Sequence, residues 1–410
     1  MSESISGTLA EVVAWDRPDA PGFCDLGPDL KAIPVLNENH LINLVKDAVA
    51  SGRRLLPAGG GRGGPFGPVG FDVVLDLRRQ HRVIDWDGES FVVTVESGIS
   101  IGQLGEQLAL SGASLAGWRR EHPSCTIGGL LSTWQPTPHG LWNGSVREAC
   151  IGLGVVTGTG DHYDYVPAPR KASGPDLRFL FIGGEGAFGI IATATLGVSI
   201  APVDRRALRV QCAEPATALA FLTQAQWNGL RCPNMLYSAA GGELHILLEG
   251  TRPTVTLMAD VVRGTARRFG LDTTDFDPDA YYAPERGDLR AGADPVTGRA
   301  EGKRRAVALW GAWSTLRRLP ARTLEAGVLY DIGLHHAALH VPADAIDGLG
   351  FGALQDRRAA WLDGEGAIEA TWPAASAAAS AVIAAAKAAL DPAGILPRPH
   401  GWFHDDGGKP

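Results

Sequence analysis

A glycine motif followed by β-branched residues limits the folds open to this chain more than any other stretch. In FIGGEGAFGIIATATLGVSI, Gly184, Gly186 and Gly189 have the spacing G-x-G-x-x-G. They follow the apolar run 179–182, which predicts a strand. A dinucleotide-binding Rossmann turn needs a helix after the third glycine, because the helix N-terminus carries the pyrophosphate. Residues 190–200 instead alternate between β-branched and small or polar types, which predicts a second strand and argues against a Rossmann unit.

Length, charge and cysteine content set broad limits on the class of protein. A chain of 410 residues can form two domains, and 45% hydrophobic with 20% charged residues is ordinary for a globular protein. A net charge of −8 without a long basic run argues against a nucleic-acid partner. We see no signal peptide and no stretch long enough to span a membrane. Five widely spaced cysteines fit reduced thiols, so we expect a cytoplasmic protein.

The first half of the chain predicts short strands separated by Gly and Pro turns, with two helices between them. Helical periodicity occurs at residues 40–50, after Asn37 as a cap, and at residues 101–111. The predicted strands are residues 73–77, 91–96, 151–156 and 196–200. This mixture indicates an α+β fold.

The second half predicts a separate domain after Pro202. Its elements follow the order β-α-β-β-α, which suggests an antiparallel sheet with helices on one face. They are residues 206–212, 216–227, 234–238, 243–249 and 254–269. Residues 271–302 predict a long loop, residues 327–341 a strand, and residues 374–390 an alanine-rich helix.

Two segments of the first half have the residue types of a phosphate or cofactor site. In LLPAGGGRGGPFGP, five glycines within six residues let backbone N–H groups converge on an anion, and Arg62 adds positive charge. A flexible surface loop is the alternative; no Lys-Ser/Thr pair follows, so this is not a Walker loop. The candidate residues are Pro57, Ala58, Gly59, Gly60, Gly61, Arg62 and Gly63.

The second segment, HPSCTIGGLLST, combines hydroxyls with glycines before a helix predicted to start at about Leu130. This pattern suits a phosphate or the polar rim of a heterocycle, or an ordinary helix cap. The candidate residues are Pro123, Ser124, Cys125, Thr126, Gly128, Gly129 and Ser132. Downstream, VVTGTGDHYD predicts a hairpin that turns at residues 158–161.

Taken in order, these motifs resemble the FAD-binding domain of the vanillyl-alcohol oxidase family, which has the PCMH-type fold. The resemblance covers about residues 30–202, and the family pattern G-G-x-G-x-x-G-I-I-T-x-x-T-L matches residues 183–196. It implies that the glycine loop binds the pyrophosphate and that the T-I-G-G segment lies along the flavin. It also implies that Gly189, with backbone groups near Ile190 and Ile191, lies beside the adenine half of FAD.

The resemblance extends more loosely to the rest of the chain. LDPAGILP resembles the D-P-x-G-I-L-N-P signature with which the family's chain returns to the flavin domain, and the overall look is most similar to the glycolate oxidase branch of the family. We therefore expect a two-subdomain FAD-binding domain and a cap domain. The expected divisions are an extension at 1–29, the FAD domain at 30–202, the cap at 203–373 and the returning segment at 374–410.

The sequence departs from the family where some members tether flavin. The glycine loop contains no histidine, and Cys125 lies one position from where bicovalent members place their cysteine. The resemblance leaves two interpretations of Cys125 open: a covalent tether to flavin, or a small buried thiol. We expect non-covalent FAD.

In this fold the cap covers the flavin ring, so the cap would supply catalytic groups. LYDIGLHHAALHV, read as one strand, places Tyr330, His336 and His340 on one face, where one of them could take the proton of a substrate hydroxyl. A partly exposed sheet edge is the alternative. The histidines lack a companion acid at ligand spacing, so we expect no metal. Arg119, Arg120 and His122 are either anion ligands or solvated charges.

The function implied is FAD-dependent removal of a hydride from a C–OH or C–N substrate, such as a glycolate-type 2-hydroxy acid. Electrons would pass to oxygen, a quinone or a protein partner. Two alternatives stay open. The chain could be a tailoring oxidase that acts on a larger natural product, or a non-catalytic FAD-carrying subunit that pairs with a catalytic homologue.

Overall fold

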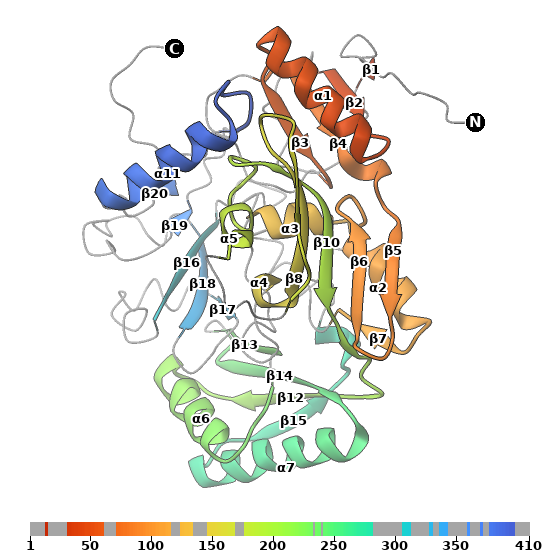
Figure 1. Cartoon of the computed structure of the whole chain (residues 1–410). Helices are drawn as coiled ribbons and strands as arrows, with labels where there is room; N and C mark the ends of the chain where they lie inside the picture. Colours follow the sequence, from red (N-terminus) through yellow and green to blue (C-terminus); the bar gives the residue numbers. More distant parts are fainter. Residues whose placement is uncertain are drawn as a thin grey trace.

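The computed structural model of the chain describes residues 31–60, 71–115, 124–133, 146–168, 176–232, 234–238, 241–281 and 377–397. It also describes strands at 13–14, 306–312, 328–330, 336–342, 359–360 and 370–371. The three larger sheets follow one another through the molecule (Figure 1). An N-terminal sheet lies at one end, and a sheet covered by two long helices lies at the other.

The N-terminal sheet has three parallel strands and one antiparallel edge strand, in the order β1-β2-β4-β3. The strands are β1 (Val13–Ala14), β2 (Lys31–Pro34), β3 (Leu55–Ala58) and β4 (Val73–Asp76). Helix α1 (Glu38–Ser51) packs its apolar face on this sheet. Asn37 caps it by accepting a 2.9 Å hydrogen bond from His40 N. The helix predicted at 40–50 is confirmed, together with its cap.

The second sheet is antiparallel, in the order β5-β6-β10-β8-β9. Its strands are β5 (Val83–Asp87), β6 (Val92–Glu96), β8 (Cys150–Val156), β9 (His162–Tyr165) and β10 (Ile190–Gly197). The strand after Gly189 is thus confirmed, as is the hairpin of β8 and β9, in which Val156 pairs with His162. The chain also forms η2 (Leu77–Arg79), α4 (Val146–Ala149) and a ribbon of β7 (Ala113–Ser114) with β11 (Ser199–Ile200).

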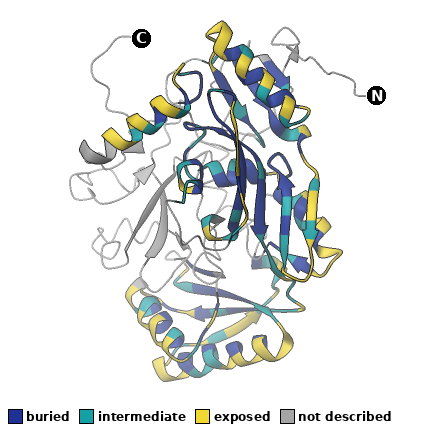
Figure 2. Ribbon diagram, viewed as in Figure 1, coloured by how far each residue is buried: buried dark blue, intermediate teal, exposed yellow. Residues whose placement is uncertain are grey.

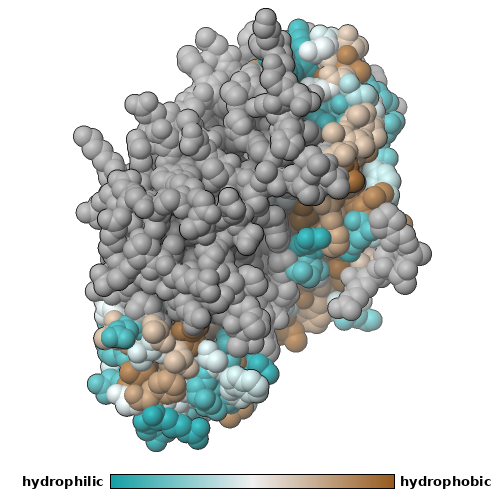
Figure 3. Space-filling view, turned by 90° about the vertical axis from the view of Figure 1, so that its left-hand side faces the viewer, coloured by the Kyte–Doolittle hydropathy of each residue, from teal (hydrophilic) through white to brown (hydrophobic). Residues whose placement is uncertain are grey.

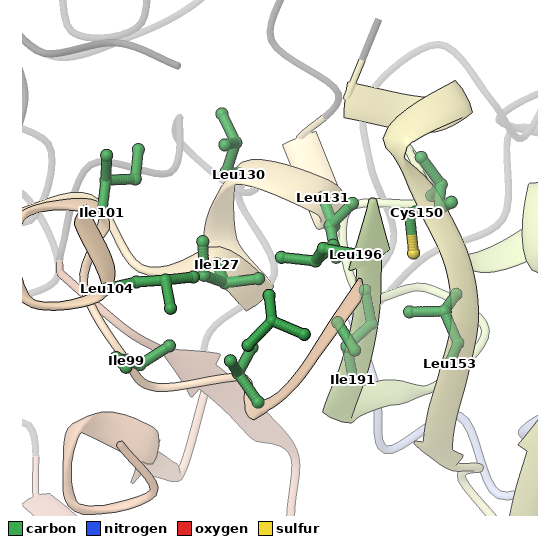
Figure 4. Packing of buried hydrophobic residues seen from close by; sticks show 14 of the residues in the cluster. Ile99, Ile101, Leu104, Ile127, Leu130, Leu131, Cys150, Leu153, Ile191 and Leu196 are labelled. Carbon is green, nitrogen blue, oxygen red and sulfur yellow. The ribbon is translucent and has the colours of Figure 1, made fainter. Parts of the chain in front are cut away.

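Helices α2 (Ile101–Ala109) and α3 (Ile127–Thr133) share one hydrophobic core with this sheet. Figure 4 shows Ile127 beside Leu104 of α2, and Leu131 beside Leu196 of β10. All four side chains are fully buried. The core therefore holds α3 through its own side chains, although the helix is only seven residues long.

Two local predictions in this half are wrong. Residues 179–182 do not form a strand: residues 179–181 belong to the single helical turn α5 (Arg178–Phe181), and Ile182 caps its end. Arg178 is buried and donates through Nε and Nη2 to the Asp176 carboxylate and through Nη1 to Cys150 O, which fixes the start of that turn. Helix α3 begins at Ile127, three residues before the predicted start at Leu130.

The third sheet has nine antiparallel strands in the order β15-β12-β14-β13-β17-β18-β16-β19-β20. Its first strands are β12 (Asp204–Gln211), β13 (Asn234–Ser238), β14 (Glu243–Gly250) and β15 (Thr273–Phe276). The remaining strands are β16 (Ala306–Ala312), β17 (Val328–Tyr330), β18 (His336–Pro342), β19 (Ala359–Ala360) and β20 (Ala370–Thr371).

Helices α6 (Pro215–Trp227) and α7 (Arg252–Phe269) cover one face of this sheet, as the β-α-β-β-α order predicts. Their inward sides are buried and their outward sides exposed (Figure 2). Figure 3 shows hydrophilic and hydrophobic residues side by side on the described surface at this end of the molecule.

The later part of the third sheet corrects two further predictions. The long loop predicted from residue 271 begins instead with β15, which pairs with β12, and the 3-10 helix η3 (Asp279–Tyr281). The single strand predicted at 327–341 is two antiparallel strands, β17 and β18, in which Tyr330 pairs with Ala338. Asp331 and Gly333, residue types that strands disfavour, lie between them.

The C-terminal helix α11 (Ala377–Leu390) leads back to the N-terminal sheet. Ile395 and Leu396 are buried in the same core as Leu55 and Leu75, and Leu55 N donates a 2.7 Å hydrogen bond to Ile395 O. None of the helices in the described part of the chain combines the length and apolar character that crossing a membrane requires.

Candidate functional site

The two segments predicted to bind a cofactor in the first half pack directly against each other. Strand β3 ends at Ala58, and Gly59 and Gly60 follow it. A Cβ on Gly59 would lie 2.0 Å from Thr126 Oγ1, and one on Gly60 would lie 2.1 Å from Ser124 O. Only glycine permits so close an approach, because real Cβ contacts below 3.0 Å essentially do not occur.

Backbone hydrogen bonds join the segment that contains Ser124 to the chain that follows β6. Ile101 N donates to Cys125 O at 2.8 Å, and Gly128 N donates to Ser97 O at 2.7 Å. A Cβ on Gly128 would lie 2.8 Å from Ser97 Cβ, so this contact also requires glycine. The Thr126 hydroxyl accepts from Gly129 N at 3.3 Å. This hydroxyl therefore acts as the ordinary helix cap that the sequence left as an alternative.

The third glycine segment, residues 183–189, joins the site at the other end of α3. Gly183 N donates to Leu131 O and Glu185 N donates to Ser132 O, both at 2.9 Å. Gly183 and Gly186 have φ of 77° and 78°, and Glu185 between them has φ of 48°. Left-handed backbone of this kind needs support from its surroundings, because it is disfavoured for a residue with a side chain.

The first and third glycine segments also meet. A Cβ on Gly186 would lie 3.9 Å from Pro57 Cγ, which is ordinary contact distance. Segments more than 120 residues apart in sequence thus lie side by side, with the Pro57 ring next to Gly186.

Ile190 and Ile191 continue this surface into β10. They pair with Val156 and Val155 of β8, whereas the pairing of β10 with β6 begins only at Thr193. Among the described strands, these two residues therefore have a strand neighbour on one side. Their buried side chains anchor the strand, since Ile190 packs in the core of the N-terminal sheet and Ile191 in the core of the second sheet.

The buried cysteines of this region have the character of structural thiols. Cys125 is 5% exposed and packs in the core of the second sheet. Cys150 lies in the same core, and burial raises the pKa of its thiol to about 12. Cys125, Cys150, Cys212 and Cys232 are thiols that form no disulfide.

Polar residues on the third sheet form a cluster that sequence reasoning missed. The buried His245 lies 2.9 Å from Glu243 through Nε2 and Oε2, and its ring packs on Phe276 at 5.5 Å. Arg209 Nε lies 3.3 Å from the same carboxylate oxygen. Burial alone would raise the pKa of Glu243, but the hydrogen bond with His245 and the charge of Arg209 lower it overall. The signal was the alternation in ELHILLEG, where polar residues occupy the positions that face away from the helices.

This cluster is linked by backbone register to one predicted catalytic residue. His245 pairs with Leu236, and Leu236 pairs with Tyr330. His336 pairs with Ala312, and His340 pairs with Ala308 and Val328. Tyr330, His336 and His340 therefore lie on adjacent strands of one sheet and not on a single strand. Their roles stay predictions.

The remaining predicted site residues lie outside the described residues. They are Gly61, Arg62, Gly63, Arg119, Arg120, His122 and Pro123. Within the described ranges, no group of three His, Cys, Asp or Glu side chains could hold a metal ion.

The described residues fit FAD. The close contacts of Gly59 with Thr126 and of Gly60 with Ser124 O leave no room for side chains, so the backbone of the two segments lies close together, as binding of a phosphate by backbone N–H groups requires. Beneath Gly128, the buried Ser97 hydroxyl has no hydrogen-bond partner among the described residues, as is found for groups that a bound molecule satisfies. Residues of all three predicted segments contribute to this arrangement.

Comparison with known proteins is consistent with this geometry. Residues 32–165 match the family model described as FAD binding domain. D-2-hydroxyglutarate dehydrogenase of Xanthomonas citri pv. viticola is 31% identical over 162 residues, which cover 39% of this chain and 34% of the relative. The chain thus matches about a third of the length of that curated relative.

Two solved structures share the fold. An alkyldihydroxyacetonephosphate synthase superposes with a TM-score of 0.70 at 17% identity, covering 90% of this chain and 78% of its own. A p-cresol methylhydroxylase solved with substrate bound superposes with a TM-score of 0.59 at 16% identity, covering 77% and 75%. The predicted α+β fold, of PCMH type with an antiparallel-sheet cap, is confirmed.

Proposed function

We propose, from the match of residues 32–165 to the FAD binding domain model, that the chain is an FAD-dependent oxidoreductase acting on a C–OH substrate. A 2-hydroxy acid is the proposed substrate class. The name of the related D-2-hydroxyglutarate dehydrogenase supports this substrate class. The resemblance to the glycolate oxidase branch also supports it, and membership of that branch stays a prediction.

One observation carries the proposal: three glycine-containing segments, far apart in sequence, meet at α3 in backbone contact. We assign the segment with Gly59 and Gly60 to the pyrophosphate and the segment from Ser124 to Ser132 to the flavin. The backbone at Gly189, Ile190 and Ile191 would bind the adenine half. The buried, core-packed Cys125 favours non-covalent FAD.

When bound, FAD supplies the hydride acceptor. The chain supplies binding, orientation and a group that takes the hydroxyl proton as the hydride leaves the carbon. Tyr330, His336 and His340 are the proposed sources of that group, because they lie on adjacent strands of the cap sheet. The C–N substrate class, and the wider pocket of a tailoring oxidase, are kept as alternatives.

We further propose a cytoplasmic location and small-molecule substrates, with electrons passed to oxygen, a quinone or a partner protein. A reducing compartment is supported by four thiols that form no disulfide, those of Cys125, Cys150, Cys212 and Cys232.

The test begins with the purified protein's visible spectrum, followed by acid precipitation. We expect flavin absorbance that is released into the supernatant. Candidate 2-hydroxy acids are then added without oxygen, and one of them should bleach the flavin. Colour retained in the pellet would contradict non-covalent binding. Bound flavin that no candidate reduces would favour the non-catalytic subunit, and a protein that refuses added FAD would contradict the proposal as a whole.

A further inference from the structure

Lys387, the only charged residue of α11, is buried beside residues 183–189 of the proposed cofactor site. Its Nζ donates to Ala187 O at 2.6 Å, to Pro397 O at 3.1 Å and to Leu396 O at 3.3 Å. A lysine is seldom buried unless its charge is paired and its three donors are used. Here carbonyls from two separate segments converge on it.

The charge of Lys387 is balanced by Asp391, one helical turn further on. The two side chains form an ion pair of 2.6 Å, and the Asp391 side chain has no exposed surface. Its carboxylate also accepts from Ile395 N and Leu396 N, both at 3.0 Å. Gly158 lies against it, since a Cβ there would be 2.5 Å from Asp391 Oδ1. The pair therefore fixes the turn from Asp391 to Pro397.

That turn touches both glycine segments. Ala187 lies within residues 183–189, and a Cβ on Gly186 would lie 3.6 Å from Pro397 Cγ. Leu55, which donates to Ile395 O, begins strand β3, which ends at Ala58 directly before Gly59. The ammonium group thus connects the C-terminal turn directly with residues 183–189. The same turn contacts the strand that precedes Gly59 through Ile395 O.

We propose that Lys387 is a positioning residue for FAD, one that fixes the glycine segments before the cofactor arrives. Glycine loses more conformational freedom on ordering than any other residue. Without Lys387, the entropy lost in ordering these glycine-rich segments would therefore be subtracted from the free energy of FAD binding. A site that is already ordered binds its ligand more tightly. The proposal rests on the FAD site proposed above.

Two variants test this role. Lys387→Arg keeps a positive charge beside Asp391, but its flat guanidinium cannot donate to converging carbonyls as an ammonium does. Lys387→Met combined with Asp391→Asn removes both charges and keeps similar side-chain sizes. The matched control is Arg205→Lys in the cap, where Arg205 pairs with Glu249 at 3.0 Å and Asp279 at 2.7 Å. FAD is titrated into each apoprotein, and amide hydrogen exchange of residues 183–191 is measured without FAD.

We expect both Lys387 variants to raise the FAD Kd by about fivefold or more, which is roughly 1 kcal/mol. Amide exchange in residues 183–191 should also accelerate, while Arg205→Lys leaves both values unchanged. A wild-type Kd and wild-type exchange in either variant would overturn the proposal. Wild-type protein that fails to bind FAD would instead contradict the proposed function.

Discussion

Gly60→Ala changes the contact between two segments of the proposed FAD site while leaving every charge in place. The new Cβ would lie 2.1 Å from Ser124 O and 3.1 Å from the carbonyl carbon, and both atoms belong to the backbone. The shorter distance must lengthen to at least 3.0 Å, so the two segments have to separate. Overpacking of this kind costs about 1–3 kcal/mol.

Because FAD is proposed to bind where these segments meet, we expect that free energy to be lost from binding. A loss of about 1–3 kcal/mol corresponds to a Kd raised roughly 5- to 150-fold. In the assay, FAD is titrated into the apoprotein and binding is measured by the quenching of flavin fluorescence. The cap should stay folded, because its helices and strands pack in a core of their own.

The control is Gly264→Ala on α7, where an added Cβ meets nothing within 4 Å. This substitution should leave the FAD Kd unchanged and stabilise the helix by about 1 kcal/mol. A Gly60→Ala variant that binds FAD with the wild-type Kd would refute the assignment of this loop to the cofactor.

Two further substitutions test the packing. Leu131→Ala, at a fully buried position in α3, should lower the free energy of unfolding by about 2–5 kcal/mol. Leu110→Ala, at a position 91% exposed, should change it little, and equal effects in urea denaturation would contradict the core described here. Burial raises the pKa of Cys212 from 9.0 to about 11, so unfolding releases its proton between these values. Titration of Cys212 should therefore leave the free energy of unfolding unchanged below pH 9. Between pH 9 and pH 11 it should lower that free energy by up to roughly 2 kcal/mol. Cys212→Ala should flatten this decline, and an unchanged slope of the urea midpoint against pH would show that other groups cause it.

Local patterns predicted much of this fold because their physical causes are local. Asn37 followed by an amphipathic run defines α1, and alternation after Gly189 defines β10. The same reasoning failed at residues 179–182, because four apolar residues suit a buried turn as well as a strand. The contact that favours the turn over a strand is the hydrogen bond from Arg178 to Cys150 O, 28 residues away in sequence.

For the site, the glycine motifs identified the segments but not how they meet. The need for glycine at position 60 comes from Ser124, and the need at position 128 comes from Ser97. Lys387 was missed for a similar reason: one lysine in an alanine-rich helix reads as a solvated charge until its acceptors are known. A lone charge in an otherwise apolar helix was the available signal.

The bond between Lys387 and Ala187 joins residues 200 positions apart, and this separation has a consequence for synthesis. At about 5–20 residues per second, roughly 10–40 s pass between the addition of these two residues to the growing chain. Throughout that interval the N-terminal sheet lacks Ile395 and Leu396 from its core, while the cap is translated and can fold. The nascent chain therefore presents an unfinished apolar surface on the ribosome, and cofactor capture is expected to follow release instead of accompanying translation.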